Sequence, residues 1–429
     1  MRILKFKYLF LITCFMAINA TNTEYLKQLD MESSKNVSHA SLTERCGQLN
    51  ESMANASCAN GTRPYWLLSL DGGGIRGLMH LYALVKLEEI TQKSVIDLFD
   101  GVAGTSIGGV IACLLTLPNP EFPTRSLYSA RDVLEIMLEN KDEMVVTNWE
   151  SLGGILGTHY KTAPVKNFLE KILRKNSFKN RLLPTVLITH DLHSYSERLI
   201  STTDSQDFYT KDVAMATCAA PTYCEPQYVS TIDSSNEYLL SDGGTAMNNP
   251  VLAGIALIQQ HYGASMDDIC AVSFGTGVVG ERHNGDFLRS GGCFDWACEI
   301  ADLCIDGQLS VIESTAKLYL GNRYYRFNPY LGKGNVRLDD VSERYIRTLR
   351  NASSQMLDAN NKFSVIAAAL QIDANNDAEL KKEERSVGMQ QQNVEKNVLP
   401  PSVACSDAPV VAEWSCWNTF KGWLADLCG

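Results

Sequence analysis

Ser106 stands in a sequence that would make it a nucleophile. It is the central residue of a G-x-S-x-G pentapeptide, in which Gly104, Thr105, Ile107 and Gly108 surround it. This pattern is typical of a sharp strand-to-helix turn that holds the serine hydroxyl clear of the backbone. The helix N-terminus beneath the serine would favour a developing oxyanion. The pattern therefore indicates attack on a carbonyl carbon.

A glycine-rich turn upstream would supply the matching oxyanion hole. Asp71 opens this turn, and the residues that follow it are Gly72, Gly73, Gly74, Ile75, Arg76 and Gly77. Backbone N–H groups in such a loop, for example those of Gly73 and Gly74, can converge on a carbonyl oxygen as it gains charge. One alternative is a dinucleotide-binding turn, with Asp97 near the acidic position of that fingerprint. Asp97 precedes Leu98-Phe99 instead of ending a strand, which disfavours this reading. A second alternative is that both glycine turns only connect packed elements.

A serine nucleophile needs a base, and Asp242 is the best-placed candidate. It ends an apolar strand and is followed by Gly243-Gly244. The chain has seven histidines, but none lies in a glycine-flanked corner. Asp242 would also suit a turn or a helix cap, so that alternative stays open.

Apolar runs separated by turn residues predict the elements that position these side chains. The predicted strands cover 65–70, a short stretch ending at Ala103, 185–189, 198–201, 237–240 and 269–274. The predicted helices cover 78–90, 110–115, 127–139, 165–173 and about 249–260. Strands that alternate with helices predict an α/β domain of three layers.

Taken together, these motifs resemble the patatin family of lipid acyl hydrolases. The resemblance rests on the stretches 71–77, 104–109 and Asp242-Gly243-Gly244, and further on 216–223 and 273–277. It extends from about Tyr65 to Gly277 and continues more weakly to about residue 370. Cys218 stands where the family often has serine, and Cys224 is unusual nearby. These two cysteines could form an extra disulfide.

The resemblance implies a three-layer α/β/α fold with a mostly parallel central sheet and a phospholipase A-type activity. Ser106 would attack the ester carbonyl, Asp242 would accept its proton directly, and an acyl-enzyme would follow. The loop from Gly72 to Gly77 would hold the oxyanion. Arg76 would meet a phospholipid phosphate, or else form a structural ion pair. The substrate would be a phospholipid or another acyl lipid at a membrane or lipid-aggregate surface, with no cofactor and no metal.

Two other functions remain open at this point. One is a conventional Ser-His-Asp esterase that uses His261 or His283, which follow Asp242 in the chain. The other is a storage or binding protein that keeps the fold but not the activity, although all three motifs are intact.

The N-terminal residues indicate secretion. Residues 1–20 have the layout of a signal peptide, with Arg2, Lys5 and Lys7 before an apolar run, and an uncleaved anchor or a core-packed start is the alternative. Residues 21–62 form a polar extension with N-x-S/T sequons at Asn36, Asn50, Asn55 and Asn60, and a fifth sequon lies at Asn351. The chain has 13 cysteines, a high number for a reducing compartment. We therefore predict a disulfide-bonded glycoprotein that is secreted or lies in the secretory-pathway lumen.

The remaining organisation follows from composition. We predict a catalytic domain over 63–371, a polar linker over 372–402 and a Cys/Trp-rich segment over 403–429. That last segment has an amphipathic pattern, which suits packing on the catalytic domain or binding to lipid. The net charge of −11 disfavours a nucleic-acid partner, and no apolar run after the N-terminus is long enough for a transmembrane helix.

Overall fold

The protein is represented by a computed structural model, which describes residues 63–148, 150, 157–278, 292–332, 337–359 and 361–397. The predicted signal peptide, the extension predicted to be glycosylated and the Cys/Trp-rich segment 403–429 therefore lie outside the described residues. The chain forms one compact unit up to Ala374, and residues 375–429 are divided from it.

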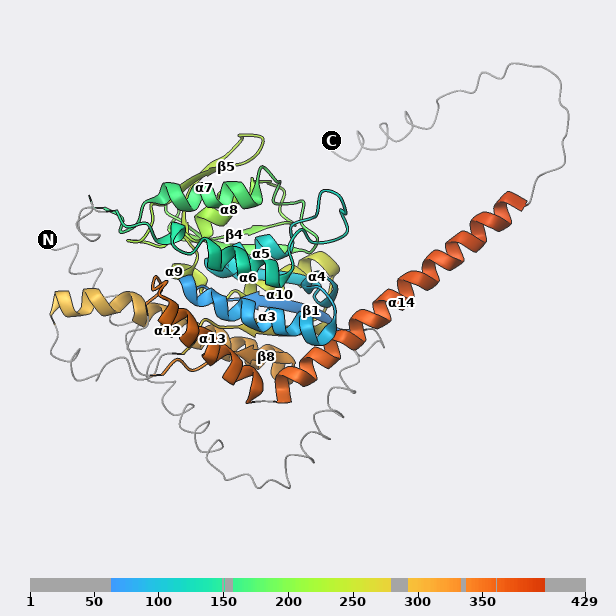
Figure 1. Cartoon of the computed structure of the whole chain (residues 1–429). Coiled ribbons are helices and arrows are strands. Elements are labelled where there is room, and N and C mark those ends of the chain that lie inside the picture. Colours follow the sequence, from blue (N-terminus) through green and yellow to red (C-terminus); the bar gives the residue numbers. More distant parts are fainter. Residues whose placement is uncertain are drawn as a thin grey trace, which may run out of the picture. The chain divides into compact units, whose positions relative to one another are not determined.

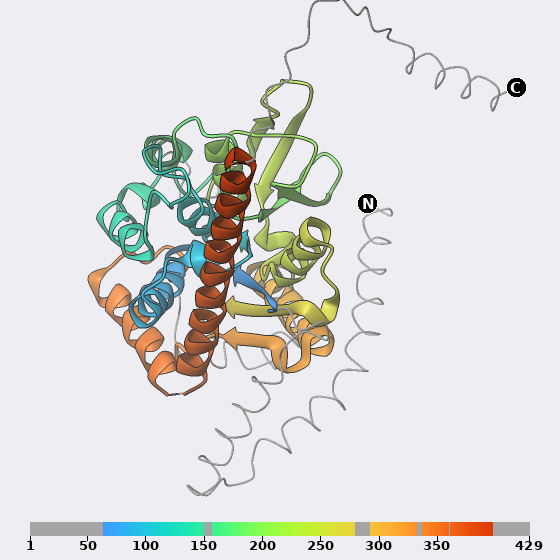
Figure 2. The ribbon, with the colours of Figure 1, turned by 90° about the vertical axis from the view of Figure 1, so that its right-hand side faces the viewer.

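The described residues contain an eight-stranded sheet in the order β5-β6-β3-β2-β1-β7-β8, with β4 paired to β3 (Figures 1 and 2). Its strands are β1 (Tyr65–Leu70), β2 (Gly101–Thr105), β3 (Thr185–Asp191), β4 (Ser196–Ser201), β5 (Gln227–Ser230), β6 (Glu237–Asp242), β7 (Ile269–Phe274) and β8 (Tyr324–Phe327). The pairs β3-β2, β2-β1, β1-β7 and β7-β8 are parallel, whereas β4, β5 and β6 join by antiparallel pairing. The predicted α/β fold with a mostly parallel sheet is confirmed.

Helices cover both faces of this sheet. The α-helices are α3 (Leu78–Thr91), α4 (Val95–Leu98), α5 (Ile107–Leu115), α6 (Ala130–Glu139), α7 (Thr162–Leu173), α8 (Thr210–Thr217), α9 (Gly244–Met247), α10 (Val251–Tyr262), α12 (Cys293–Leu320), α13 (Glu343–Asp358) and α14 (Asn361–Asn397). Short 3-10 turns are η1 (Gly74–Gly77), η2 (Glu143–Val145), η4 (Met266–Asp268) and η5 (Gly321–Arg323). Among the described residues, no helix is both long and apolar enough to span a bilayer.

The alternation of side chains along the strands divides the core in two. Leu68 of β1 points to a core that it shares with α3, α5, α6, α7, α8 and α13. Its neighbour Leu67 points to the opposite core, which α10 and the second half of α12 fill. Successive strand residues face opposite sides of a sheet, so two buried faces require nearly continuous apolar strands. This arrangement is the three-layer α/β/α architecture that the sequence predicts.

The predicted polar linker over 372–402 is helical in its described part. Residues 372–397 are helical, as the continuation of α14. The stretch is polar but rich in Glu, Lys and Gln, which favour a helix even without an apolar face.

Candidate active site

Ser106 occupies the corner between β2 and α5. Its backbone has φ 54° and ψ −127°, an uncommon conformation for a residue other than glycine. The corner is tight, because a Cβ on Gly108 would lie 2.2 Å from the carbonyl oxygen of Leu70. The backbone N–H of Ser106 donates to the hydroxyl of Thr217 at 3.0 Å, which fixes the strained turn. The sequence motif therefore folds into the strand-turn-helix geometry that it predicts.

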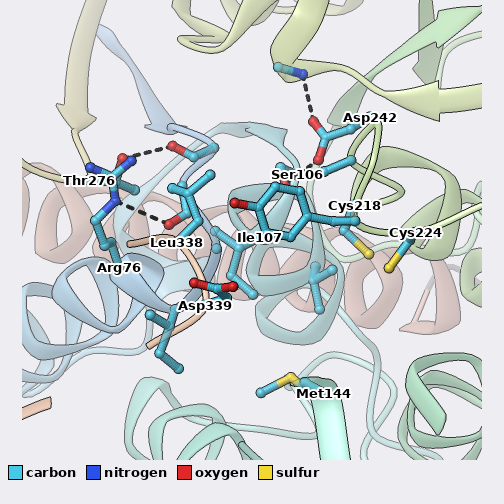
Figure 3. Close-up of a pocket in the computed structure, with 18 of the residues that line it drawn as sticks. Arg76, Ser106, Ile107, Met144, Cys218, Cys224, Asp242, Thr276, Leu338 and Asp339 are labelled. Atoms are coloured by element: carbon cyan, nitrogen blue, oxygen red, sulfur yellow. Dashed lines mark hydrogen bonds between the residues drawn. The ribbon is translucent and has the colours of Figure 1, made fainter. Parts of the chain in front are cut away.

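Asp242 meets Ser106 although the two residues are far apart in the chain. Thr105 is in register with Ile188 of β3, and Thr189 of β3 is in register with Asp242 of β6. This register brings the Ser106 hydroxyl to within 2.5 Å of Asp242 Oδ2, to which it donates (Figure 3). The other carboxylate oxygen accepts from the backbone N–H of Gly244 at 2.6 Å.

The environment of Asp242 makes it a stronger base than an ordinary carboxylate. The side chain is buried, and burial raises its pKa from 3.8 to about 6. The hydrogen bonds from Ser106 and Gly244 lower the pKa and so oppose that shift. At neutral pH the carboxylate is ionised and is hydrogen-bonded to the hydroxyl that it would deprotonate.

The glycine loop leaves two backbone donors for an oxyanion. The N–H groups of Gly72, Ile75 and Arg76 donate to Asn248 O, Leu338 O and Gly73 O. The N–H groups of Gly73 and Gly74 make no hydrogen bond to any described residue, and both glycines line the cavity beside Ser106. Of the predicted oxyanion residues, Gly73 and Gly74 are therefore the ones with available donors. Gly77 has a packing role, because a Cβ there would lie 2.8 Å from Ile107.

An ion pair that the sequence analysis missed holds the start of this loop. Arg326 of β8 donates to Asp71 Oδ1 at 2.9 Å and to Asp71 Oδ2 at 2.6 Å. The same guanidinium group also bonds Ser273 at 2.9 Å and pairs with Glu313. Burial raises the pKa of Asp71 to about 6, and Arg326 opposes that shift. The only sequence signal for this contact is a charged residue within the apolar run Tyr324–Phe327.

A cavity of about 850 Å³ opens on the Ser106-Asp242 pair. One wall is apolar and comes from α6, η2 and α7, and its residues include Met137, Met144, Val165, Phe168 and Leu169. Ile305 and Leu309 of α12 also line it. The cavity has a polar part as well, where Tyr160 donates to Asp339. Arg76 reaches the cavity too, as Figure 3 shows.

The cysteines of the cavity are thiols in this structure. Cys218 and Cys224 both line the cavity and both are free, so the extra disulfide is not formed. Cys218 Sγ instead contacts the carbonyl oxygen of Met215 at 3.5 Å. Burial raises the pKa of both thiols, which keeps them protonated at neutral pH.

The described residues do not supply a histidine to the site. None of the cavity-lining residues that the structure describes is a histidine. His261 is exposed in the last turn of α10, against Tyr262, and His283 lies outside the described residues. His190 contacts Thr245 Oγ1 at 3.3 Å but does not line the cavity.

The dinucleotide alternative is not supported either. Asp97 lies in the short helix α4, where its carboxylate accepts from the Ser94 hydroxyl at 2.6 Å in a capping box. It therefore caps a helix and does not end a strand, where a ribose would bind. In the part of the chain that the structure describes, no group of three or more side chains could hold a metal ion.

The fold and the site define an α/β protein with a serine on a strand-to-helix corner and a buried aspartate beside it. Residues 68–255 match the family model described as patatin-like phospholipase. The chain carries a domain of the patatin-like phospholipase family, as the motifs predict.

Known proteins agree with this assignment. "Patatin-like protein 4" of Arabidopsis thaliana is 26% identical over 362 residues, which cover 74% of this chain and 90% of that protein. "Probable inactive patatin-like protein 9" of the same plant is 26% identical over 300 residues, covering 62% and 74% of the two chains. The crystal structure of VipD from Legionella pneumophila has a TM-score of 0.31 at 13% identity, covering 69% of this chain and 67% of that one.

Proposed function

We propose that this protein is a lipid acyl hydrolase of phospholipase A type that uses Ser106 as nucleophile and Asp242 as base. The observation that supports this most is the 2.5 Å hydrogen bond from the Ser106 hydroxyl to Asp242, two residues that line a cavity of about 850 Å³. The patatin-like domain indicates a lipid as substrate. The apolar wall of the cavity suits an acyl chain, and the polar part with Arg76 suits an ester and its headgroup.

The geometry supports a two-step reaction. In the first step Asp242 accepts the hydroxyl proton while Ser106 Oγ bonds to the ester carbon, and the N–H groups of Gly73 and Gly74 stabilise the oxyanion. The C–O bond of the ester then breaks, and the alcohol leaves with the proton from Asp242. In the second step water gives a proton to Asp242 while its oxygen bonds to the acyl carbon. The bond from that carbon to Ser106 Oγ then breaks, Asp242 returns the proton to Oγ, and the fatty acid leaves. No histidine is needed for either step.

Paired substitutions test this proposal. Ser106→Ala and Asp242→Asn should each lower the turnover of a short soluble ester about 10²-fold or more, because nucleophile and base act as a unit. The double variant should be no worse than either single one. Ser241→Ala is the matched control, since this serine precedes Asp242 but does not line the cavity. If a folded Asp242→Asn variant keeps more than about a tenth of the turnover, the assigned base is wrong.

A catalytically silent protein is the second candidate, since one similar protein is described as probably inactive by its name. The intact Ser106-Asp242 hydrogen bond favours activity. A fluorophosphonate probe separates the two functions, because an active serine is labelled and a silent one is not.

A further inference from the structure

Thr276 lies in a glycine turn to which the reaction described above assigns no role. Strands β1 and β7 pair in parallel up to their last residues, so the turns that follow them lie side by side. The N–H of Gly275 donates to Phe327 O at 2.8 Å. The N–H of Gly277 donates to Asn328 Oδ1 at 2.8 Å. Thr276 is therefore held between two anchored residues, and it is buried in the wall of the cavity.

The hydroxyl of Thr276 bonds the first carbonyl of the oxyanion loop. Its Oγ1 donates to Gly72 O at 2.8 Å, and the amide of Asn248 donates to the same oxygen at 3.3 Å. Both donor residues are buried. The approach is close, because a Cβ on Gly73 would lie 2.3 Å from Thr276 Oγ1. Two side chains therefore fix the direction in which the Gly72 carbonyl points.

The direction of this carbonyl decides where the N–H of Gly73 points. The two groups belong to one planar trans peptide, in which C=O and N–H point in opposite directions. The side-chain donors hold one edge of the peptide, and the N–H projects from the other edge with no partner among the described residues. A carbonyl that accepts two hydrogen bonds also makes the N–H of its own peptide a stronger donor.

The base and this peptide lie on different sides of the nucleophile. Figure 3 shows Asp242 and Thr276 to either side of Ser106. The Ser106 hydroxyl points to Asp242, to which it donates at 2.5 Å. An oxyanion needs donors away from that carboxylate, because two negative charges repel each other. The side of the cavity on which Thr276 lies suits this requirement.

We propose that Thr276 is a positioning residue for the oxyanion hole, because its hydroxyl holds Gly72 O so that the N–H of Gly73 points at the developing oxyanion. Thr276 itself moves no proton and makes no bond to the reacting atoms. The proposal rests on the hydrolase function proposed above, since the oxyanion forms only when Ser106 attacks a carbonyl. It assigns the role to the hydroxyl of Thr276 and not to its methyl group.

Two substitutions of Thr276 test this role on a short soluble ester. Thr276→Val keeps nearly the same shape but removes the hydroxyl, and it should lower kcat about tenfold with little change in KM. Deleting an oxyanion donor outright costs about 10²–10³-fold, and the smaller loss is expected because Asn248 still holds Gly72 O. Thr276→Ser keeps the hydroxyl and should restore kcat to within about threefold of the wild-type value.

Thr116→Val is the matched control. The hydroxyl of Thr116 donates to Ala112 O at 2.7 Å, and the residue is buried but does not line the cavity. This variant loses the same kind of hydrogen bond, so its melting temperature should fall about as much as that of Thr276→Val. Its kcat and KM should stay at the wild-type values.

Ketone binding gives a readout that a merely structural role would not move. With a short alkyl trifluoromethyl ketone, Ser106 Oγ bonds to the carbonyl carbon, its proton passes to Asp242, and the carbonyl oxygen becomes an oxyanion. The methyl ketone of equal chain length binds without this addition. Thr276→Val should weaken the binding of the trifluoromethyl ketone about tenfold and leave the affinity for the methyl ketone unchanged.

A folded Thr276→Val variant with wild-type kcat would overturn the proposal, and so would a Thr276→Ser variant as slow as Thr276→Val. Equal weakening of both ketones would also overturn it, because the substitution would then have changed the cavity and not the oxyanion hole. Turnover that persists in Ser106→Ala would contradict the proposed function instead. The two ketone affinities, measured by calorimetry in the absence of turnover, would still decide the role of Thr276.

Discussion

Asp242 is the residue whose ionisation should set the pH dependence of the reaction. Burial raises its pKa to about 6, and only the ionised carboxylate can accept the proton of Ser106. We therefore expect kcat/KM on a soluble ester to rise about tenfold per pH unit below about pH 6 and to level off above it. A midpoint near 4, or one that His190→Gln abolishes, would contradict the assignment of the base.

The same pKa shift predicts that the ionised carboxylate of Asp242 lowers the stability of the folded protein at neutral pH. The folded protein holds the Asp242 proton more tightly than the unfolded chain, with a pKa of about 6 against 3.8. Stability from this group is therefore lost as the pH rises from about 4 to about 6. At pH 7 we expect Asp242→Asn to raise the free energy of unfolding by about 1–3 kcal/mol.

Urea unfolding at two pH values checks this expectation. The increase in the free energy of unfolding that Asp242→Asn gives should be present near neutral pH. It should vanish below about pH 4, where the wild-type carboxyl is protonated in both the folded and the unfolded protein. An Asn variant that is less stable than wild type at neutral pH would contradict this expectation, because the hydrogen bonds to the ionised carboxylate would then outweigh the cost of burying it.

At the scale of elements, β8 should matter for catalysis although it supplies no reacting group. Arg326 holds Asp71 through both carboxylate oxygens, and Asp71 directly precedes the glycine loop. A lysine at position 326 would keep the positive charge but could not bond both carboxylate oxygens of Asp71 at once. The oxyanion donors would then be displaced, so Arg326→Lys should lower kcat about tenfold with little change in KM. Arg323→Lys is the control, since Arg323 bonds Met266 O and Asp267. A folded Arg326→Lys variant with full kcat would contradict this positioning role.

The elements that sequence patterns predicted are those with strong local signals. Apolar residues bounded by turn residues mark the run Tyr65–Leu70 and the strand that ends at Asp242, and glycine-rich turns stand beside them. The structure has strands and turns at these places. Asp242 was recognisable as a candidate because it closes such a strand. The register that brings it to Ser106 is set by pairing across β2, β3 and β6, which no local pattern encodes.

Other elements had no comparable signal. β8 has four residues with an arginine among them, and its place beside β7 depends on contacts across the sheet. α12 has apolar residues on two faces, which blurs the helical period that a single buried face would give. The Arg326-Asp71 pair joins residues 255 positions apart, so composition and spacing could not reveal it.

At the scale of the whole molecule, the N-terminal sequence predicts processing and secretion. Removal of residues 1–20 and glycans on the sequons between Asn36 and Asn60 would give a secreted glycoprotein. Mass spectrometry of the protein from a eukaryotic secretory host should find an N-terminus near Thr21 and a mass that falls after glycosidase treatment. A protein that stays in the cells with Met1 intact would contradict this prediction.

The central claim is that Ser106 is acylated and that Asp242 alone activates it. Peptide mass mapping after brief exposure to an activated ester and an acid quench tests this claim directly. The account predicts an acyl group on the peptide that contains Ser106, lowered about 10²-fold or more in Asp242→Asn and unchanged in His190→Gln. Turnover without an acyl group on Ser106, or equal acylation in Asp242→Asn, would contradict it.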